Sequence, residues 1–357
     1  MTKMIKLSLV AAVAVAGLST TASAVSIEDA IKNVTVSGQM RLRTEGTNAG
    51  GSASTETLND FDSDIKFKNK LSDTNTIVIK VEADSQTDAD EATGATEAKM
   101  NAQVTNAYLQ TKAGSATVLV GRQGVPGPFT DGAAGAGVVA LVPAGPVTIA
   151  AGFFNNTDIA AGVDATEVAV IGKTGNVAFD VWYASVQAVG TLLSVHANTT
   201  IGTVGIDARH STMTGDASGD KAGTLTKVVA STKVNNIGLA LGIAITNKDA
   251  RRIAIDNDND AKTDFKVWQA SVGGLSDATA ILIAASTKVS AVTLGAKYVT
   301  VDYKSGTADV TATEMLVDAK YSIAKNIALS GKYSIAGNDV SGSNDSTKTR
   351  IEVKYTF

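Results

Sequence analysis

The feature that most constrains the fold is a period-two alternation of apolar and polar side chains, repeated in segments of roughly ten residues. In the first segment, Val36 and Met40 lie on one face of the predicted strand and Arg41 lies on the other. The same alternation recurs in three further segments, at residues 77–82, 237–245 and 314–321. A strand with one apolar and one charged face cannot lie inside a dry core. Many such strands in one chain indicate a sheet with lipid on one side and water on the other.

The connections between these segments alternate between short turns and longer loops, as in outer-membrane barrels with tight periplasmic turns and long external loops. Eight short connections are centred on Leu71 to Asn75, Ala113 to Ser115, Pro143 to Pro146, Thr174 to Asn176, Thr200 to Gly202, Asn235 to Asn236, Val289 to Ser290, and Ala324 to Asn326. With both termini periplasmic, eight turns imply nine external loops. We therefore expect an all-β fold, a closed antiparallel transmembrane β-barrel of 18 strands, with 16 as the alternative count.

One segment conflicts with a simple count. Residues Phe265 to Val272 could form a strand, but counting it would reverse the orientation of every later strand. We therefore place it inside a long external loop from Asn247 to Asp277. A soluble β-solenoid is the alternative architecture, but it predicts a fixed internal repeat, and the sequence has none.

Both ends of the chain carry export features. Lys3 and Lys6 precede an apolar run that ends at a small-residue cleavage site, which predicts a signal peptide at residues 1–24 and a mature barrel at residues 25–357. The apolar run is shorter than the roughly 20 residues that a membrane-anchoring helix needs. The last strand ends on Phe357, which resembles the signal that the barrel-assembly machinery recognises. We therefore expect the cell outer membrane as the location, with its lipid around the barrel.

Composition argues against nucleic-acid binding and is compatible with a sheet without disulfides. Without Lys3 and Lys6, 29 of the 31 basic side chains remain against 35 acidic ones, a formal net charge of about −6 that argues against nucleic-acid binding. The chain has no cysteine, so disulfides do not stabilise it. Proline is scarce, which suits paired strands.

Several short motifs together resemble the Campylobacter-type major outer membrane protein family. They are Lys6 to Val10, Ile27 to Lys32, Val34 to Gly38, Asn106 to Leu109, and Val120 to Gln123. The resemblance implies a trimeric, 18-stranded general porin that needs no nucleotide or redox cofactor. This chain departs from the family in being shorter and poor in aromatic residues, so we expect a thin aromatic girdle.

In general porins the third external loop folds into the barrel and narrows it. By our count this loop covers residues 123–137, where Pro126 and Pro128 restrict the backbone. We expect Asp131 to form the acidic side of a pore constriction. Its basic side is expected to be a group of lumen-facing residues, namely Arg41, Arg43, Lys66, Lys68 and Arg122. Opposed charges would orient polar solutes and slow apolar ones; ordinary wetted wall charges are the alternative for any one of them.

An acidic run offers carboxylates at alternate positions, at Asp256, Asp258 and Asp260, which is the spacing of a calcium loop. It lacks the glycine of an EF-hand, because Ala261 stands at the sixth position, and it lacks the closing glutamate. A solvated acidic loop is the favoured interpretation, with a loosely bound calcium ion as the alternative.

An enzyme is not expected. No nucleophile motif lies near His196 or His210, and the pair Ser194 and His196 is predicted to face the lumen. The expected function is passive, weakly cation-preferring diffusion of ions and small hydrophilic solutes. A structural or adhesive barrel with a closed lumen is the second function class, and it should conduct no current when folded.

Overall fold

The computed structural model describes residues 32–50, 56–85, 101–159, 162–249, 251–256 and 260–357. The predicted signal peptide lies outside this part of the chain. Within these ranges no helix is long and apolar enough to span a bilayer.

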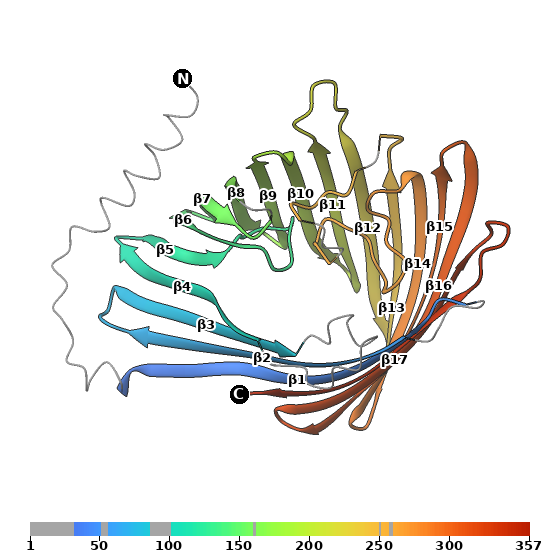
Figure 1. The fold of residues 1–357 in the computed structure, drawn as a ribbon, viewed down its shortest axis with the longest axis horizontal. Helices are drawn as coiled ribbons and strands as arrows, with labels where there is room; N and C mark the ends of the chain where they lie inside the picture. Colours follow the sequence, from blue (N-terminus) through green and yellow to red (C-terminus); the bar gives the residue numbers. More distant parts are fainter. Residues whose placement is uncertain (1–31, 51–55, 86–100, 160–161, 250, 257–259) are drawn as a thin grey trace, which may run out of the picture.

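Eighteen strands form one sheet in which each strand pairs antiparallel with its neighbours in sequence, and β18 pairs with β1 (Figure 1). The sheet is therefore closed, as expected, and has 18 strands rather than 16. The strands are β1 Val34–Asn48, β2 Glu56–Lys70, β3 Asn75–Ser85, β4 Asn101–Ala113, β5 Ala116–Gly124, β6 Ala134–Ala144, β7 Val147–Thr157, β8 Val163–Thr174, β9 Val177–Val186, β10 Gly190–Ile201, β11 Val204–Thr214, β12 Gly223–Val234, β13 Ile237–Thr246, β14 Ser276–Val289, β15 Val292–Ser305, β16 Ala308–Ala324, β17 Ile327–Asn338 and β18 Ser346–Thr356.

The eight short turns all lie within two residues of their predicted positions, at one end of the barrel. Two-residue hairpin turns need a residue with positive φ, because their twist must match that of the strands. Asn235 supplies it between β12 and β13, with φ 56°. Asparagine tolerates this conformation better than most residues, which explains why a turn without glycine was recognisable in the sequence.

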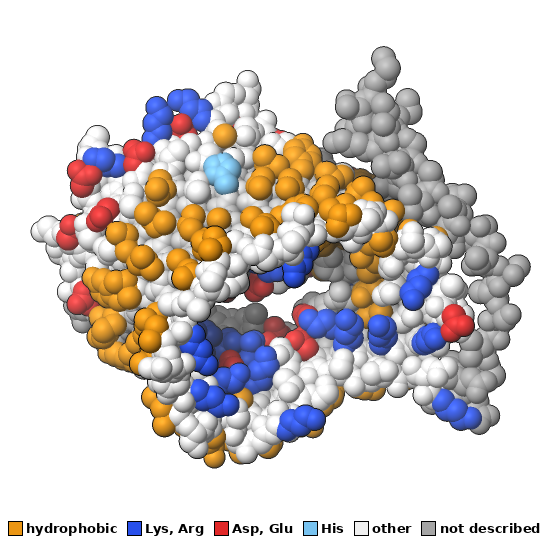
Figure 2. Space-filling view, turned by 180° about the vertical axis from the view of Figure 1, so that it is seen from behind, with side chains coloured by type: hydrophobic (Ala, Val, Ile, Leu, Met, Phe, Trp, Pro, Cys, Tyr) orange, Lys and Arg blue, Asp and Glu red, His pale blue; other side chains and the backbone are white. Residues whose placement is uncertain are grey.

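Alternation along each strand separates an outer from an inner face. The exposed large apolar side chains fall on the outer face, for example Leu42 on β1, Leu241 on β13 and Ile351 on β18. In Figure 2 they form a band around the outside of the molecule, while basic and acidic side chains line an opening into the barrel. Three aromatic residues, Tyr321, Tyr355 and Phe357, are exposed near the barrel end that carries the short turns.

The seam between the first and last strands is closed by the final residue. The backbone N–H of Phe357 donates to the carbonyl of Gly38 at 3.0 Å, and the N–H of Gly38 donates to the carbonyl of Phe357 at 2.9 Å. A Cβ atom on Gly38 would lie 2.1 Å from the carbonyl oxygen of Asp64 and 2.9 Å from the Phe357 ring. Glycine is therefore required here for β1 to approach both neighbours.

Among the described residues, two loops at the opposite end enter the barrel. L3 (residues 125–133) joins β5 to β6, and L7 (residues 247–275) joins β13 to β14 (Figure 1). L7 occupies the range predicted for the long loop, and its residues Lys266 and Ser271 form only an isolated bridge, not a strand of the barrel. L3 is shorter than the expected 123–137 because β5 and β6 extend further.

An apolar cluster, here called the internal core, fills the space between these loops and the inner wall from β6 to β15. Its fully buried members include Phe129 of L3, Phe154 of β7, Ile255 of L7 and Val299 of β15. The barrel is thus apolar on its outside and also on one side of its interior.

The close packing at Gly38 can be tested by substitution. Replacing Gly38 with Ala is expected to destabilise the folded barrel by about 1–3 kcal/mol, because the added methyl group overpacks against backbone atoms that cannot move freely. The measurement is the urea concentration at the midpoint of unfolding in detergent. The mobility of unheated protein on gels reports the folded fraction at each urea concentration. Gly331→Ala is the matched control, since a Cβ there meets nothing nearer than 3.9 Å. Equal stability of the two variants would contradict the packing argument.

Candidate pore and constriction

Charged side chains gather on five neighbouring strands of the inner wall. We call the lumen-facing residues of β17, β18, β1, β2 and β3 the charged wall. Arg41 and Arg43 lie at its centre, on the face of β1 opposite to Met40 and Leu42. Arg41 contacts Asp62 at 2.6 Å, and Arg43 contacts Glu352 at 3.3 Å. The ion pairs link adjacent strands, so they tie neighbouring parts of the wall together.

The charge is not evenly distributed along this wall. Toward the loop end of this wall, basic residues lie on β17 and β18, namely Lys332, Lys348 and Arg350, while Asp60, Asp62 and Asp84 lie on β2 and β3. The basic residues of β2 and β3 on the same face lie nearer the short turns, namely Lys66, Lys68 and Lys80. Glu45 of β1 bonds both Lys348 and Arg350. The wall therefore changes from basic to acidic over a few strands.

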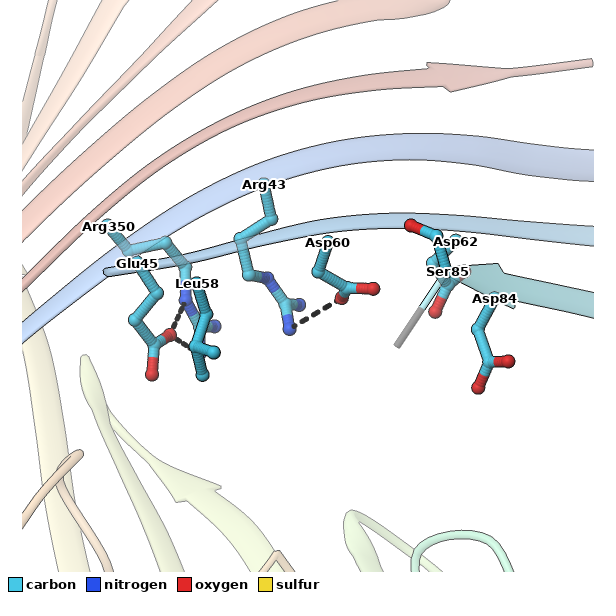
Figure 3. Close-up of a pocket in the computed structure, with 8 residues that line it drawn as sticks. All are labelled: Arg43, Glu45, Leu58, Asp60, Asp62, Asp84, Ser85 and Arg350. Carbon is cyan, nitrogen blue, oxygen red and sulfur yellow. Dashed lines mark hydrogen bonds and ion pairs between the residues drawn. The ribbon is translucent and has the colours of Figure 1, made fainter. Parts of the chain in front are cut away.

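A pocket of about 430 Å³ opens at this change of sign (Figure 3). Four carboxylates line it, Glu45, Asp60, Asp62 and Asp84, against the two guanidinium groups of Arg43 and Arg350. In Figure 3 the side chains of Asp60 and Asp84 point into the open space, and Glu45 bonds Arg350. The pocket is consequently acidic.

The base of L7 is anchored on β12 and β13, outside the charged wall. The Lys227 ammonium of β12 donates to the carbonyls of Lys262 and Asp264, at 2.7 and 2.6 Å. The ring of Phe265 occupies the space that a side chain on Gly242 of β13 would fill, since a Cβ there would lie 2.9 Å from the ring. The small residues of β13 thus admit the loop.

The tip of L7 reaches across to β16, β17 and β18. The buried Glu314 of β16 accepts the backbone N–H groups of Trp268, Gln269 and Ala270, at 3.1, 2.9 and 2.7 Å. The Trp268 indole lies over Lys332, with the ammonium 3.9 Å from the ring centroid. L7 therefore connects β12 and β13 with β16 to β18, three to six strands further along the sheet, and covers part of the basic side of the charged wall.

L3 packs beneath L7. The Ile255 N–H of L7 donates to the Phe129 carbonyl at 2.9 Å, and the Thr263 N–H donates to the Pro128 carbonyl at 3.2 Å. Gly127 lies against the indole of Trp182, a lumen-facing residue of β9. The two loops together restrict the cross-section of the lumen.

A buried polar network occupies the wall at β9, β10 and β11. His196 contacts Asp180 through Nδ1 at 2.6 Å and Asp207 through Nε2 at 2.8 Å. Ser194 accepts a hydrogen bond from Arg209 at 2.7 Å, and its partner is not the imidazole. With both ring nitrogens bound to carboxylates, His196 is not placed to activate this serine.

The remaining residues of the predicted constriction are separated. Lys66 and Lys68 lie exposed on β2, near its end at the short turn, and share the face of Asp62 and Asp64. Arg122 lies near the other end of β5, on the face of the exposed Val120, and contacts Asp158 at 3.3 Å. Asp131 is exposed on L3.

Of the predicted calcium ligands, Asp258 lies outside the described residues. Asp256 accepts a hydrogen bond from Thr130, and Asp260 contacts Lys266 at 2.9 Å. The described part of the chain contains no cluster of three or more side chains suited to a metal ion.

Sequence reasoning missed L7 as a component of the constriction, together with Trp268 and Glu314. Two signals were present. The loop contains apolar residues such as Ile253, Ile255 and Phe265, which an exposed loop rarely needs. The lumen face of β13 is Gly238, Ala240, Gly242 and Ala244, small and uncharged, which suits a packed loop better than water.

Residues 2–169 match the model of the family described as Campylobacter major outer membrane protein. This confirms the resemblance drawn from the short motifs in that half of the chain. No curated protein sequence matches the chain.

Solved porins have the same fold at low sequence identity. The chain resembles a BenF-like porin from Pseudomonas fluorescens Pf-5, with a TM-score of 0.79, 12% identity, and coverage of 91% of this chain and 99% of that one. It also resembles Pseudomonas aeruginosa OccK2 (OpdF), crystallised with glucuronate, with a TM-score of 0.77, 11% identity, and coverage of 91% and 98%. Pseudomonas aeruginosa OpdK with vanillate gives a TM-score of 0.72 at 9% identity, with coverage of 91% and 99%.

By its description the matched family is one of outer-membrane proteins, and a closed antiparallel β-barrel is also the fold of the solved BenF-like porin. Residues 2–169 are thus similar to the Campylobacter major outer membrane protein family, and the barrel has the fold of a solved porin.

Proposed function

We propose that this porin gives passive, weakly cation-preferring diffusion of ions and small hydrophilic solutes. The observation that carries the proposal is the acidic pocket at the charged wall, with four carboxylates against two guanidinium groups. Trp268 covers part of the neighbouring basic residues, so the acidic side is the more open one. A surplus of fixed negative charge along a pore raises the local concentration of cations.

The solute class follows from the lining. Charged and hydroxyl groups replace the hydration of a polar solute as it passes, whereas an apolar solute gains nothing from them. Two porins of this fold were crystallised with glucuronate and vanillate. Both are small polar molecules of the size class proposed here.

Several finer features extend the proposal. Residues 1–24 act as a signal peptide, and residues 25–357 form the mature chain. The mature chain assembles as a homotrimer, a proposal supported by the family resemblance. The barrel-assembly machinery recognises the last strand, and its position at the seam supports this role. Asp131 acts at the constriction from L3, with Arg41 and Arg43 as its basic counterparts on β1.

Charge selectivity is testable at the pocket. The double variant Asp60→Asn with Asp84→Asn is expected to lower the potassium-to-chloride permeability ratio roughly two-fold, because it removes two negative charges that face the pore. Reversal potentials of the reconstituted protein in a salt gradient give this ratio.

A matched control removes two negative charges elsewhere, with Asp73→Asn and Asp309→Asn. Their side chains are 97% and 84% exposed, at a short turn and at a strand end. This variant should keep the wild-type ratio. Anion preference of the wild type, or silence of the folded protein, would contradict the proposed function.

The role of Asp131 has its own test. Asp131→Ala is expected to change single-channel conductance by tens of per cent, because a charge on the loop alters ion concentration at the narrowest region. Planar-bilayer recordings measure this, and stepwise openings in groups of three would support the trimer. Conductance identical to wild type at low salt would remove Asp131 from the constriction.

Calcium is not required by the proposed function, since Asp256 and Asp260 already have protein partners. Treatment with a chelator is therefore expected to leave conductance and the unfolding temperature unchanged. Recordings and thermal melts with EDTA, compared with excess calcium, provide the check. A shift of several degrees in the melt would instead show a bound ion that supports the fold.

A further inference from the structure

L7 carries a folded unit of its own at its tip. Asp264 accepts the backbone N–H groups of Phe265 and Gly273, each at 2.6 Å, and also bonds the Ser271 hydroxyl. The Val272 N–H donates to the Phe265 carbonyl at 3.1 Å, which closes a small hairpin. Because these bonds lie inside the segment, they do not depend on the contact with Glu314.

The hairpin docks on β16 mainly through Glu314. This side chain is 0% exposed, and its Oε2 atom accepts three successive backbone N–H groups. Successive N–H groups directed at one oxygen form an anion-binding concavity, and a charged acceptor makes each bond stronger than a neutral one would. The other oxygen, Oε1, has no hydrogen-bond partner among the described residues. All described hydrogen bonds of this carboxylate are therefore with L7.

Two side chains of the hairpin extend the same contact. Gln269 donates to the Ser334 hydroxyl of β17 at 2.6 Å and accepts from the Ser346 hydroxyl of β18 at 2.8 Å. Trp268 lies over Lys332. Both contacts depend on the position of the backbone that Glu314 holds, because they come from the same three residues.

We infer that Glu314 is a positioning residue that sets the width of the pore. It holds a preformed hairpin across the lumen, beside the charged wall. Loss of the carboxylate releases the hairpin as a unit, because its internal bonds through Asp264 remain. The constriction then widens without unfolding of the barrel. This inference rests on the proposed function, since it defines the constriction of that same pore.

The test compares Glu314→Gln with the wild type. The amide keeps the shape, and its oxygen can accept the same N–H groups, but it lacks the charge that strengthens these bonds and its NH₂ group has no acceptor in the position of Oε1, so the docking contact is weakened. Single-channel conductance is expected to rise about two-fold, and larger neutral polymers should enter the pore. Glu314→Ala should give the same result. The mobility shift of unheated protein on gels confirms that each variant is folded.

A second readout does not depend on conduction. In a Trp182→Phe background Trp268 is the only tryptophan, and it is nearly buried, at 9% exposure. Release of the hairpin exposes this indole to water. Glu314→Gln should therefore shift its fluorescence emission to longer wavelength, whereas a well-docked hairpin leaves the emission unchanged.

Glu167→Gln is the matched control. Glu167 of β8 is also a buried glutamate, 1% exposed, but neither of its oxygens has a hydrogen-bond partner among the described residues. It should leave conductance and emission at wild-type values. Folded Glu314 variants with wild-type conductance and emission would overturn the inference, as would equal widening by Glu167→Gln. A wild type that does not conduct would contradict the proposed function alone, because the emission shift still tests the docking.

Discussion

Closure of the backbone hydrogen-bond ladder is the constraint on which the rest of the structure depends. In hydrocarbon an unpaired N–H or C=O group costs several kcal/mol, so a sheet that crosses the membrane must have no free edge. Here β18 pairs with β1 over ten residue pairs, and Phe357 continues the pairing to Gly38. Every other property of the molecule, including the pore itself, follows from a wall that is closed in this way.

The inner face of the closed wall has two different parts, one apolar and one charged. From β6 to β15 the inner face packs against L3 and L7 as an apolar core, whereas from β17 to β3 it presents ion pairs to water. Hydrophobic burial holds the loops to one side, and a single carboxylate with its neighbours holds L7 to the other. The passage for solutes is therefore displaced toward the charged wall.

The sequence predicted the barrel well because its signals are local. Alternation within strands, turn residues such as Asn235, and the strand that ends at Phe357 each act over a few residues, so the strand count and all eight turns could be derived. The interior was harder to predict, because it depends on contacts between distant segments. Glu314 is 44 to 46 positions from the N–H groups it accepts, and nothing near it in the chain indicates that role. The apolar residues of L7 and the small residues of β13 can be read from the sequence. That they pack against each other is shown only by the structure, where the Phe265 ring lies against Gly242.

The span of L7 has a mechanical consequence. A closed sheet of 18 strands encloses a lumen too wide for the side chains of its wall to fill. L7 touches β12 through Lys227 and β16 through Glu314, which fixes the distance between two walls that share no backbone hydrogen bonds. The loop thereby restrains the curvature of the wall between these two strands, as a chord restrains an arc.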